Sequence, residues 1–190
     1  MTAIKEFVKC PKCKHKIKVK VITDISNSEI KSIIDRSLFE AKCKECNETI
    51  VALYPLKIET ENYVIHFDPS YDKTIIKDKV KNKIKRLCLD YDDLKEKILI
   101  LEDNLNDIII EFIKEFYLHQ LDEQTRKKVN DIRYNSIVDN NIVLSLIGAN
   151  KNIACPLNVY QELEKRSKIK NIKHAIVIDS TSYRKYFKMR

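Results

Sequence analysis

The chain has 190 residues, of which 44% are hydrophobic and 34% charged, and its formal net charge is +8. This composition is typical of a soluble globular protein of one or two domains and excludes an intrinsically disordered chain. The single glycine excludes a glycine-rich phosphate loop, and no apolar run approaches the ~18 residues that span a bilayer. Because residues 1–6 have no apolar signal region, we expect a cytoplasmic protein.

The first third of the chain is rich in β patterns. Residues 16–22 alternate lysine with isoleucine or valine, which is the period of a strand with one buried face. A short helix is expected over 29–36, and the Asp68-Pro69-Ser70 cluster ends the unit. Strands are expected over residues 7–9, 16–22, 50–58 and 63–67. We therefore expect a first, β-rich domain over residues 1–70.

The middle of the chain carries two helical patterns. Residues 77–89 are expected to form a strand, with a helix as the alternative. Aspartates at 90–93 offer caps for a helix over 94–101. A strong helix follows over 108–121, with more apolar residues than one stripe needs. Such a helix is either deeply buried or contacts a second chain. The second alternative predicts a homodimer through 108–121.

The last third mixes strands and helices. A hairpin is expected over 132–147 because Asp139, Asn140 and Asn141 tolerate the positive φ of a tight turn. Strands over 153–155 and 175–179 and a helix from Pro156 complete the pattern. Residues 183–190 mix aromatic and basic side chains, as in a packed helical end or an interaction tail. The fold class is α+β: after the first unit, residues 71–190 form a second domain of strand, two helices, hairpin, helix and strand.

Four of the six cysteines occur as two pairs, Cys10-Pro11-Lys12-Cys13 and Cys43-Lys44-Glu45-Cys46. A C-x-x-C turn directs two thiolates to one point, and two such turns complete a tetrahedron around a metal ion. We therefore expect one structural Zn²⁺ per chain, held by Cys10, Cys13, Cys43 and Cys46 in a zinc-ribbon arrangement. Iron in the same site and reversible disulfides are the alternatives. Cys88 and Cys155 stand alone among apolar residues and are expected to be buried.

The first third resembles the CpXC domain, a prokaryotic family named for its paired cysteine motifs. The resemblance covers about residues 5–70: both cysteine pairs, the intervening strand and short helix, residues 39–43 and the strand over 51–56. Residues 94–113 resemble the region that often follows the domain. The family often has glycine after each second cysteine, where this chain has Lys14 and Asn47. The resemblance implies a metal-stabilised intracellular module and no reaction.

Two rows of lysines occur at every second residue, from Lys14 to Lys20 and from Lys77 to Lys85. On a strand, such a row lies on one face. It is typical of a solvated face or of a protected edge strand, and alternatively of a surface that follows phosphates. The candidate nucleic-acid-binding residues are Lys16, Lys18, Lys20, Lys79, Lys81, Lys83 and Lys85. Aromatic residues interleave poorly with the rows, because only Phe7 and Tyr91 flank them nearby, so a stacking platform for a single strand is not indicated.

These observations support three hypotheses about function. The first is a zinc-binding structural or interaction protein with a closed four-cysteine site, no catalytic residues and an unidentified protein partner. The second is a basic zinc protein associated with nucleic acid or ribosomes, motivated by the lysine rows. The third is a thiol redox or metal-dependent enzyme, which requires a reactive cysteine.

Overall fold

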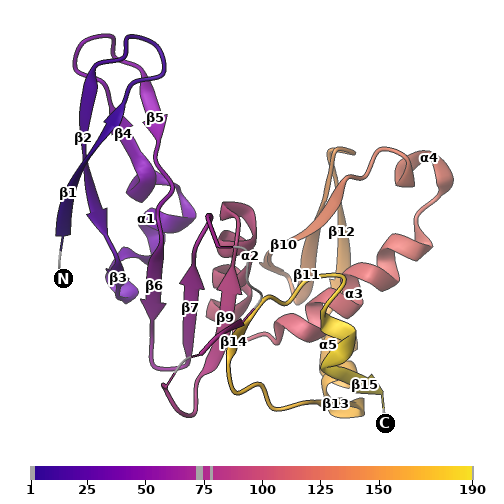
Figure 1. The fold of residues 1–190 in the computed structure, drawn as a ribbon. Coiled ribbons are helices and arrows are strands. Elements are labelled where there is room, and N and C mark those ends of the chain that lie inside the picture. Colours follow the sequence, from indigo (N-terminus) through magenta and orange to yellow (C-terminus); the bar gives the residue numbers. More distant parts are fainter. Residues whose placement is uncertain (1–2, 72–74, 78, 190) are drawn as a thin grey trace. The chain divides into compact units, whose positions relative to one another are not determined.

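The computed structural model describes residues 3–71, 75–77 and 79–189, and it confirms the α+β class. The chain divides into two compact units (Figure 1). Unit 1 contains residues 1–95 and 173–176, and unit 2 contains residues 96–172 and 177–190. This division differs from the expected boundary at residue 70, because the strand and the start of the helix that follow residue 70 belong to the first unit.

Unit 1 begins with two antiparallel hairpins (Figure 1). In the first, β1 (Ala3–Lys9) pairs with β2 (Lys16–Ile22). In the second, β4 (Glu40–Lys42) pairs with β5 (Thr49–Val51). The expected short helix lies between them as a 3-10 turn over 27–29 followed by α1 (Ile30–Ile34), and a second 3-10 turn over 37–39 precedes β4.

A six-stranded mixed sheet forms the rest of unit 1, in the order β3-β6-β7-β9-β14-β8. Its strands are β3 (Asp24–Ile25), β6 (Leu56–Glu59), β7 (Tyr63–Phe67), β8 (Ile75–Ile76), β9 (Ile84–Cys88) and β14 (Ala175–Ile176). The strand expected over 50–58 is two strands in different sheets, β5 and β6, and residues 52–55, which end at Pro55, separate them. Of the strand expected over 77–89, only residues 84–88 pair, and residue 78 lies outside the described residues.

Aromatic rings fill the core of unit 1. Phe39 is fully buried, and its ring meets those of Tyr54, Phe67 and Tyr91 edge to face, with centroids 5.3–5.9 Å apart. The Tyr91 hydroxyl donates a 2.7 Å hydrogen bond to the carbonyl of Ile33, which fixes α1. The two lone cysteines are buried as expected, Cys88 in β9 and Cys155 in a strand of unit 2.

Unit 2 packs helices against a three-stranded meander. The meander is β10 (Asp131–Val138), β11 (Asn141–Ile147) and β12 (Lys151–Pro156), and Asp139 and Asn140 at its first turn have the expected positive φ of 48° and 57°. The helices are α2 (Tyr91–Glu102), whose first residues belong to unit 1, α3 (Asp107–Gln120), α4 (Glu123–Arg126) and α5 (Leu157–Arg166). Two short strands, β13 (Ser167–Ile169) and β15 (Phe187–Met189), pair with each other. No helix of the described chain is long and apolar enough to cross a membrane.

The apolar run of α3 packs inside unit 2. Ile109, Ile110 and Ile113 are buried in the core of unit 2, whereas Phe116 is 53% exposed, so burial accounts for part of the apolar excess on this helix. The homodimer through 108–121 stays a prediction. The helix begins one residue earlier than expected because the Asn106 side chain accepts a hydrogen bond from the Ile108 N–H.

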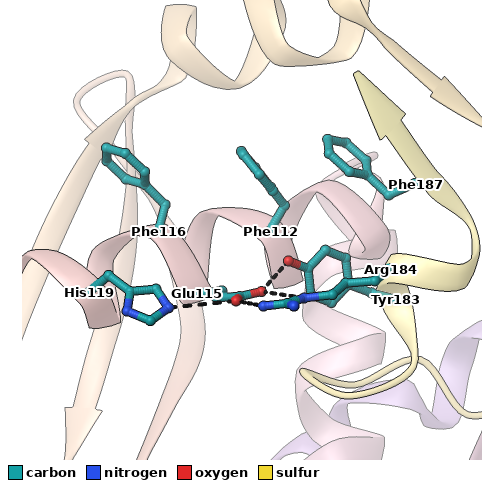
Figure 2. A pocket seen from close by; sticks show the side chains of 7 residues that line it. All are labelled: Phe112, Glu115, Phe116, His119, Tyr183, Arg184 and Phe187. Carbon is teal, nitrogen blue, oxygen red and sulfur yellow. Dashed lines mark hydrogen bonds and ion pairs between the residues drawn. The ribbon is translucent and has the colours of Figure 1, made fainter. Parts of the chain in front are cut away.

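The C-terminal residues pack against α3. Figure 2 shows Glu115 of α3 between His119, Tyr183 and Arg184, where it accepts a hydrogen bond from the Tyr183 hydroxyl. The ring of Phe187 stacks on that of Phe112, with centroids 4.8 Å apart. Tyr183 is buried, so residues 183–189 form a packed end of the fold.

A cluster of buried charged residues lies between α2, α3 and β10. The Lys114 ammonium lies 3.0 Å from Glu111 Oε1 and 3.1 Å from Glu96 Oε1. Lys97 pairs with the same Glu111 oxygen at 3.3 Å and with Asp107 at 3.4 Å. Glu96 also accepts a 2.7 Å hydrogen bond from the Tyr134 N–H, which joins the cluster to the meander.

Candidate metal centre

The two cysteine pairs form two loops of the same construction. In the first loop, the Cys10 N–H donates to the carbonyl of His15 at 2.8 Å, and the Lys14 N–H donates to the carbonyl of Cys10 at 3.0 Å. The second loop repeats both bonds at the same distances, from Cys43 to Glu48 and from Asn47 to Cys43. Each loop closes one of the two hairpins, β1–β2 or β4–β5. The backbone alone therefore sets the position of both cysteine pairs.

Each loop contains one residue in the left-handed region of φ. The residue is Lys14 in the first loop, with φ of 62°, and Asn47 in the second, with φ of 58°. Asparagine adopts this conformation readily, whereas lysine does so at a cost of about 1–2 kcal/mol. These are the two positions at which the family that the chain resembles often has glycine. Both loops form here without it.

The two loops lie side by side at the end of the hairpins (Figure 1). They bring four sulfurs together. All four Sγ atoms lie within 4.8 Å of one another. The Sγ atoms of Cys10 and Cys46 are 3.6 Å apart, and those of Cys13 and Cys43 are 3.5 Å apart. A tetrahedral ion with Zn–S bonds of about 2.3 Å requires sulfurs about 3.8 Å apart. The donor set and its spacing therefore fit a four-coordinate thiophilic metal ion.

Backbone N–H groups are directed at the sulfurs and change their acidity. The pKa of the Cys10 thiol is lowered to about 7, chiefly because the Cys13 N–H donates to its sulfur, with a smaller contribution from the Lys12 N–H. The pKa of Cys13 is lowered by the His15 N–H, but removal from water and the neighbouring sulfurs raise it overall, to about 12. Protons are thus lost stepwise from this cluster, and a bound cation would favour the loss of the remaining ones.

The cluster rests on an apolar base. Cys10 and Cys43 are fully buried and pack with Ile17 and Ile50, one from each hairpin. Cys13 is exposed and Cys46 is half-buried, so the cluster has one side toward solvent. Of the lysines around the loops, Lys12 pairs with Glu48 at 3.5 Å, and this contact joins the first loop to the second.

The remaining sequence candidates separate into two groups. Lys16, Lys18 and Lys20 lie on one exposed face of β2, as the alternation predicts. The lysines over 77–85 do not line one face of a single strand, because β9 begins only at residue 84. Lys79 and Lys81 are exposed outside any strand, whereas Lys83 pairs with Glu59 at 3.0 Å and Lys85 is buried and donates to the carbonyl of Lys173. The expectation of a second exposed lysine row was wrong.

Sequence reasoning missed what faces the first row. The register of the β1–β2 hairpin places Phe7 directly opposite Lys18, so an aromatic ring lies in the middle of the lysines. The sequence contains the information needed to place Phe7, because the cysteine loop sets which residues of β1 and β2 are opposite each other. Counting outward from the loop pairs Lys9 with Lys16 and Phe7 with Lys18. The sequence places Phe7 only near this row, whereas the register places the residue among the lysines.

One comparison with known proteins gives a match. A family model described as CpXC protein matches residues 8–114, which is more than half of the chain and includes both cysteine loops. The match extends beyond residue 70 to β9, α2 and the first half of α3. No curated protein matches the chain, and no solved structure matches it.

Proposed function

The chain belongs to the CpXC family, and on that premise we propose that its four clustered cysteines bind one structural Zn²⁺ ion per chain in a non-catalytic binding module. The observation that carries the proposal is the pair of equivalent loops that bring four Sγ atoms within 4.8 Å. Four thiolates are the ligand set of structural zinc, and with all four bound no coordination position remains for water or substrate.

The role that follows is to connect two hairpins. A two-stranded hairpin is only marginally stable in water, and β4–β5 has just three residues in each strand. Cys10 and Cys13 close one hairpin, and Cys43 and Cys46 close the other. An ion held by both pairs would link the hairpins, and structural Zn²⁺ contributes about 10–16 kcal/mol of apparent binding free energy in small modules.

The donor chemistry favours zinc over other common ions. Thiolates are soft ligands that select zinc, copper(I) or iron–sulfur centres over magnesium and calcium. Iron in a four-cysteine site has the same geometry, and it is the alternative that the test below separates. The two lone cysteines do not favour an enzyme, because both are buried and burial raises the pKa of Cys155.

Metal analysis of untagged, reduced protein tests the proposal. We expect about one zinc per chain in the wild type, and none in Cys43→Ser, which removes a fully buried ligand. Cys88→Ser is the matched control, because Cys88 is equally buried in unit 1 and belongs to no cysteine pair, so it should retain the metal. Wild-type protein without metal, or with iron, would contradict the proposal, as would a unit 1 that stays folded after complete chelation.

A further inference from the structure

The outward side of the β1–β2 hairpin carries five lysines around one phenylalanine. In an antiparallel pair, residues directly opposite each other project from the same side of the sheet. We call this surface the lysine face, and its members form three opposed pairs: Lys5 with Lys20, Phe7 with Lys18, and Lys9 with Lys16. No acidic residue belongs to it. Its charge is therefore +5 over three rows of side chains.

On the opposite side of the hairpin the residues of β2 face the interior of unit 1, whereas Glu6 of β1 is exposed. Ile17, Val19 and Val21 of β2 are buried, which leaves the alternating lysines no inward position. Among the residues that the structure describes, none of the five lysines of the lysine face forms an ion pair. The charge of this surface is thus available to a partner of opposite sign.

This arrangement is unfavourable for the free protein. Two of the three opposed pairs are Lys–Lys pairs, and like charges directly opposite each other destabilise a hairpin. Phe7 is 67% exposed at the centre of the face. Lysines on a short ribbon are common as protection against edge-to-edge aggregation, but an exposed phenylalanine works against that purpose. A binding surface accounts for both features, because a polyanion would neutralise the lysines and a planar ring would cover Phe7.

A hollow adjoins the lysine face. It has a volume of about 500 Å³ and lies within unit 1 beside Lys18 and Lys20. Lys42 and the hydroxyl-bearing residues Ser32 and Ser37 line it too, together with one carboxylate, Glu40. Ammonium and hydroxyl groups are the side-chain donors that proteins use for phosphate and sugar oxygens. The hollow therefore extends the anion-binding character of the face away from the hairpin.

We infer that the lysine face binds single-stranded nucleic acid, with phosphates on the lysines and one base stacked on the Phe7 ring. Successive lysines on one strand are about 7 Å apart, so the face offers a line of charges to an extended backbone. A single strand is favoured over a duplex because only an unpaired base can stack on a protein ring. The inference rests on the proposed function, since the zinc site would hold the hairpin that presents the face.

Fluorescence anisotropy of a labelled oligonucleotide of about 15 nucleotides tests the inference, with oligo(U) and oligo(dT) as separate probes. The experiment uses the full-length, zinc-loaded chain. If all five lysines contact phosphates of a single strand, log K falls with log salt with a slope of about −3.5. Affinity should then fall about 100-fold between about 50 and about 200 mM salt. A preference between the two probes would identify RNA or DNA as the natural form.

Three variants separate the lysine face from general charge. Phe7→Ala should weaken binding by at least about fivefold with an unchanged salt slope, because it removes stacking and no charge. Replacing the three lysines of β2 by alanine (Lys16→Ala, Lys18→Ala and Lys20→Ala) should reduce the slope to about −1.4. The matched control replaces three exposed lysines of unit 2 by alanine (Lys165→Ala, Lys168→Ala and Lys170→Ala), which changes net charge equally.

The outcomes distinguish this inference from the proposal on which it rests. Binding that is lost with the lysine-face variants and kept by the control supports the inference. Zinc-loaded, folded protein that binds neither oligonucleotide at low salt would overturn the inference and leave the zinc proposal standing. An equal loss in the control would overturn it too, and so would binding only to phosphatidylserine vesicles. Protein without zinc would instead refute the proposed function.

Discussion

Replacing Lys114 by methionine should destabilise unit 2 strongly. The Lys114 side chain is 9% exposed, and its ammonium lies 3.0–3.3 Å from three oxygens of Glu96 and Glu111, which are themselves buried. Methionine keeps the apolar stem and removes the charge. Two carboxylates then lose a shared partner in the interior, and breaking a buried pair in this way costs about 3–5 kcal/mol. The second oxygen of Glu111 has no hydrogen-bond partner, so this buried carboxylate is incompletely paired even with Lys114 in place.

The loss of stability in Lys114→Met should depend on pH, because the surroundings lower the pKa of Glu96 and raise that of Glu111. Burial raises the pKa of Glu96, but the charges of Lys114 and Lys97 outweigh it, so the pKa lies below its usual value. Glu96 therefore stabilises the fold above about pH 4.3, and this contribution is lost as the pH falls through the lowered pKa. Without Lys114 the largest charge that lowers this pKa is lost, so the pKa rises, although Lys97, Arg133 and the Tyr134 N–H still lower it. The pKa of Glu111 is already raised by burial.

Hydrogen exchange read by mass spectrometry measures the effect where it occurs. Peptides from β10 report the opening of unit 2, and peptides from β7 report unit 1 as an internal reference. At neutral pH the loss of about 3–5 kcal/mol should lower protection in β10 by about two to four orders of magnitude. Near about pH 4 the difference from the wild type should shrink, because the unpaired carboxylates bind protons.

Lys127→Met is the matched control for this change. Lys127 makes a 2.6 Å ion pair with Glu123, but both side chains are more than 70% exposed, so the loss should stay below about 0.5 kcal/mol. The reasoning would be refuted if Lys114→Met cost no more than Lys127→Met, or if its cost were the same at both pH values.

Two further predictions concern backbone conformation. Lys14→Gly should raise the stability of unit 1 by about 0.5–1 kcal/mol without changing metal content, because glycine adopts the positive φ of this position without strain. Lys14→Ala is the control, because alanine is strained there as lysine is. Equal thermal melting of the two variants would contradict the argument. Gly148→Ala should cost more than about 2 kcal/mol, since a β-carbon there would lie 2.3 Å from the Lys128 carbonyl oxygen at a φ of +89°; an unchanged melting curve would show that the loop moves freely.

The parts of the fold that the sequence predicts well are those that neighbouring residues determine. The cysteine loops follow from a three-residue spacing and from hydrogen bonds within six residues. The start of α3 follows from the Asn106 cap, and the first turn of the meander follows from Asp139 and Asn140. In each case the residues that determine the structure lie within a few positions of one another, so a short sequence pattern is enough to predict it.

The sheet of unit 1 was not predictable in the same way. Its strand β14 comes from residues 175–176, more than eighty residues after β9, with which it pairs in parallel. Nothing near Ala175 in the sequence states which strand will accept it. The lysine at every second residue over 77–85 also indicated a strand, yet only the end of this segment pairs. Period-two patterns state that a segment could be a strand, while the available partner edge decides whether it becomes one.

The buried charge cluster escaped prediction for a different reason. Lysine and glutamate are almost never fully buried unless paired, so Glu96, Lys97 and Lys114 are assigned to the surface by default. Their pairing depends on the packing of α2 against α3, which brings charged groups of residues 14 and 18 positions apart to 3.3 and 3.1 Å. A sequence pattern states the charge of a helix face, and only the packing states whether that face meets its complement.

The zinc proposal and the nucleic-acid inference are linked by the energetics of one hairpin. The β1–β2 ribbon holds two opposed Lys–Lys pairs and an exposed Phe7, features that oppose its formation in isolation. Cys10 and Cys13 at its end would bring metal-binding free energy into the same element, which offsets those costs. The β1–β2 hairpin can then stay folded without bound nucleic acid, because metal binding at the loop supplies the stabilising free energy. On this view, chelation should abolish oligonucleotide binding although no cysteine belongs to the lysine face.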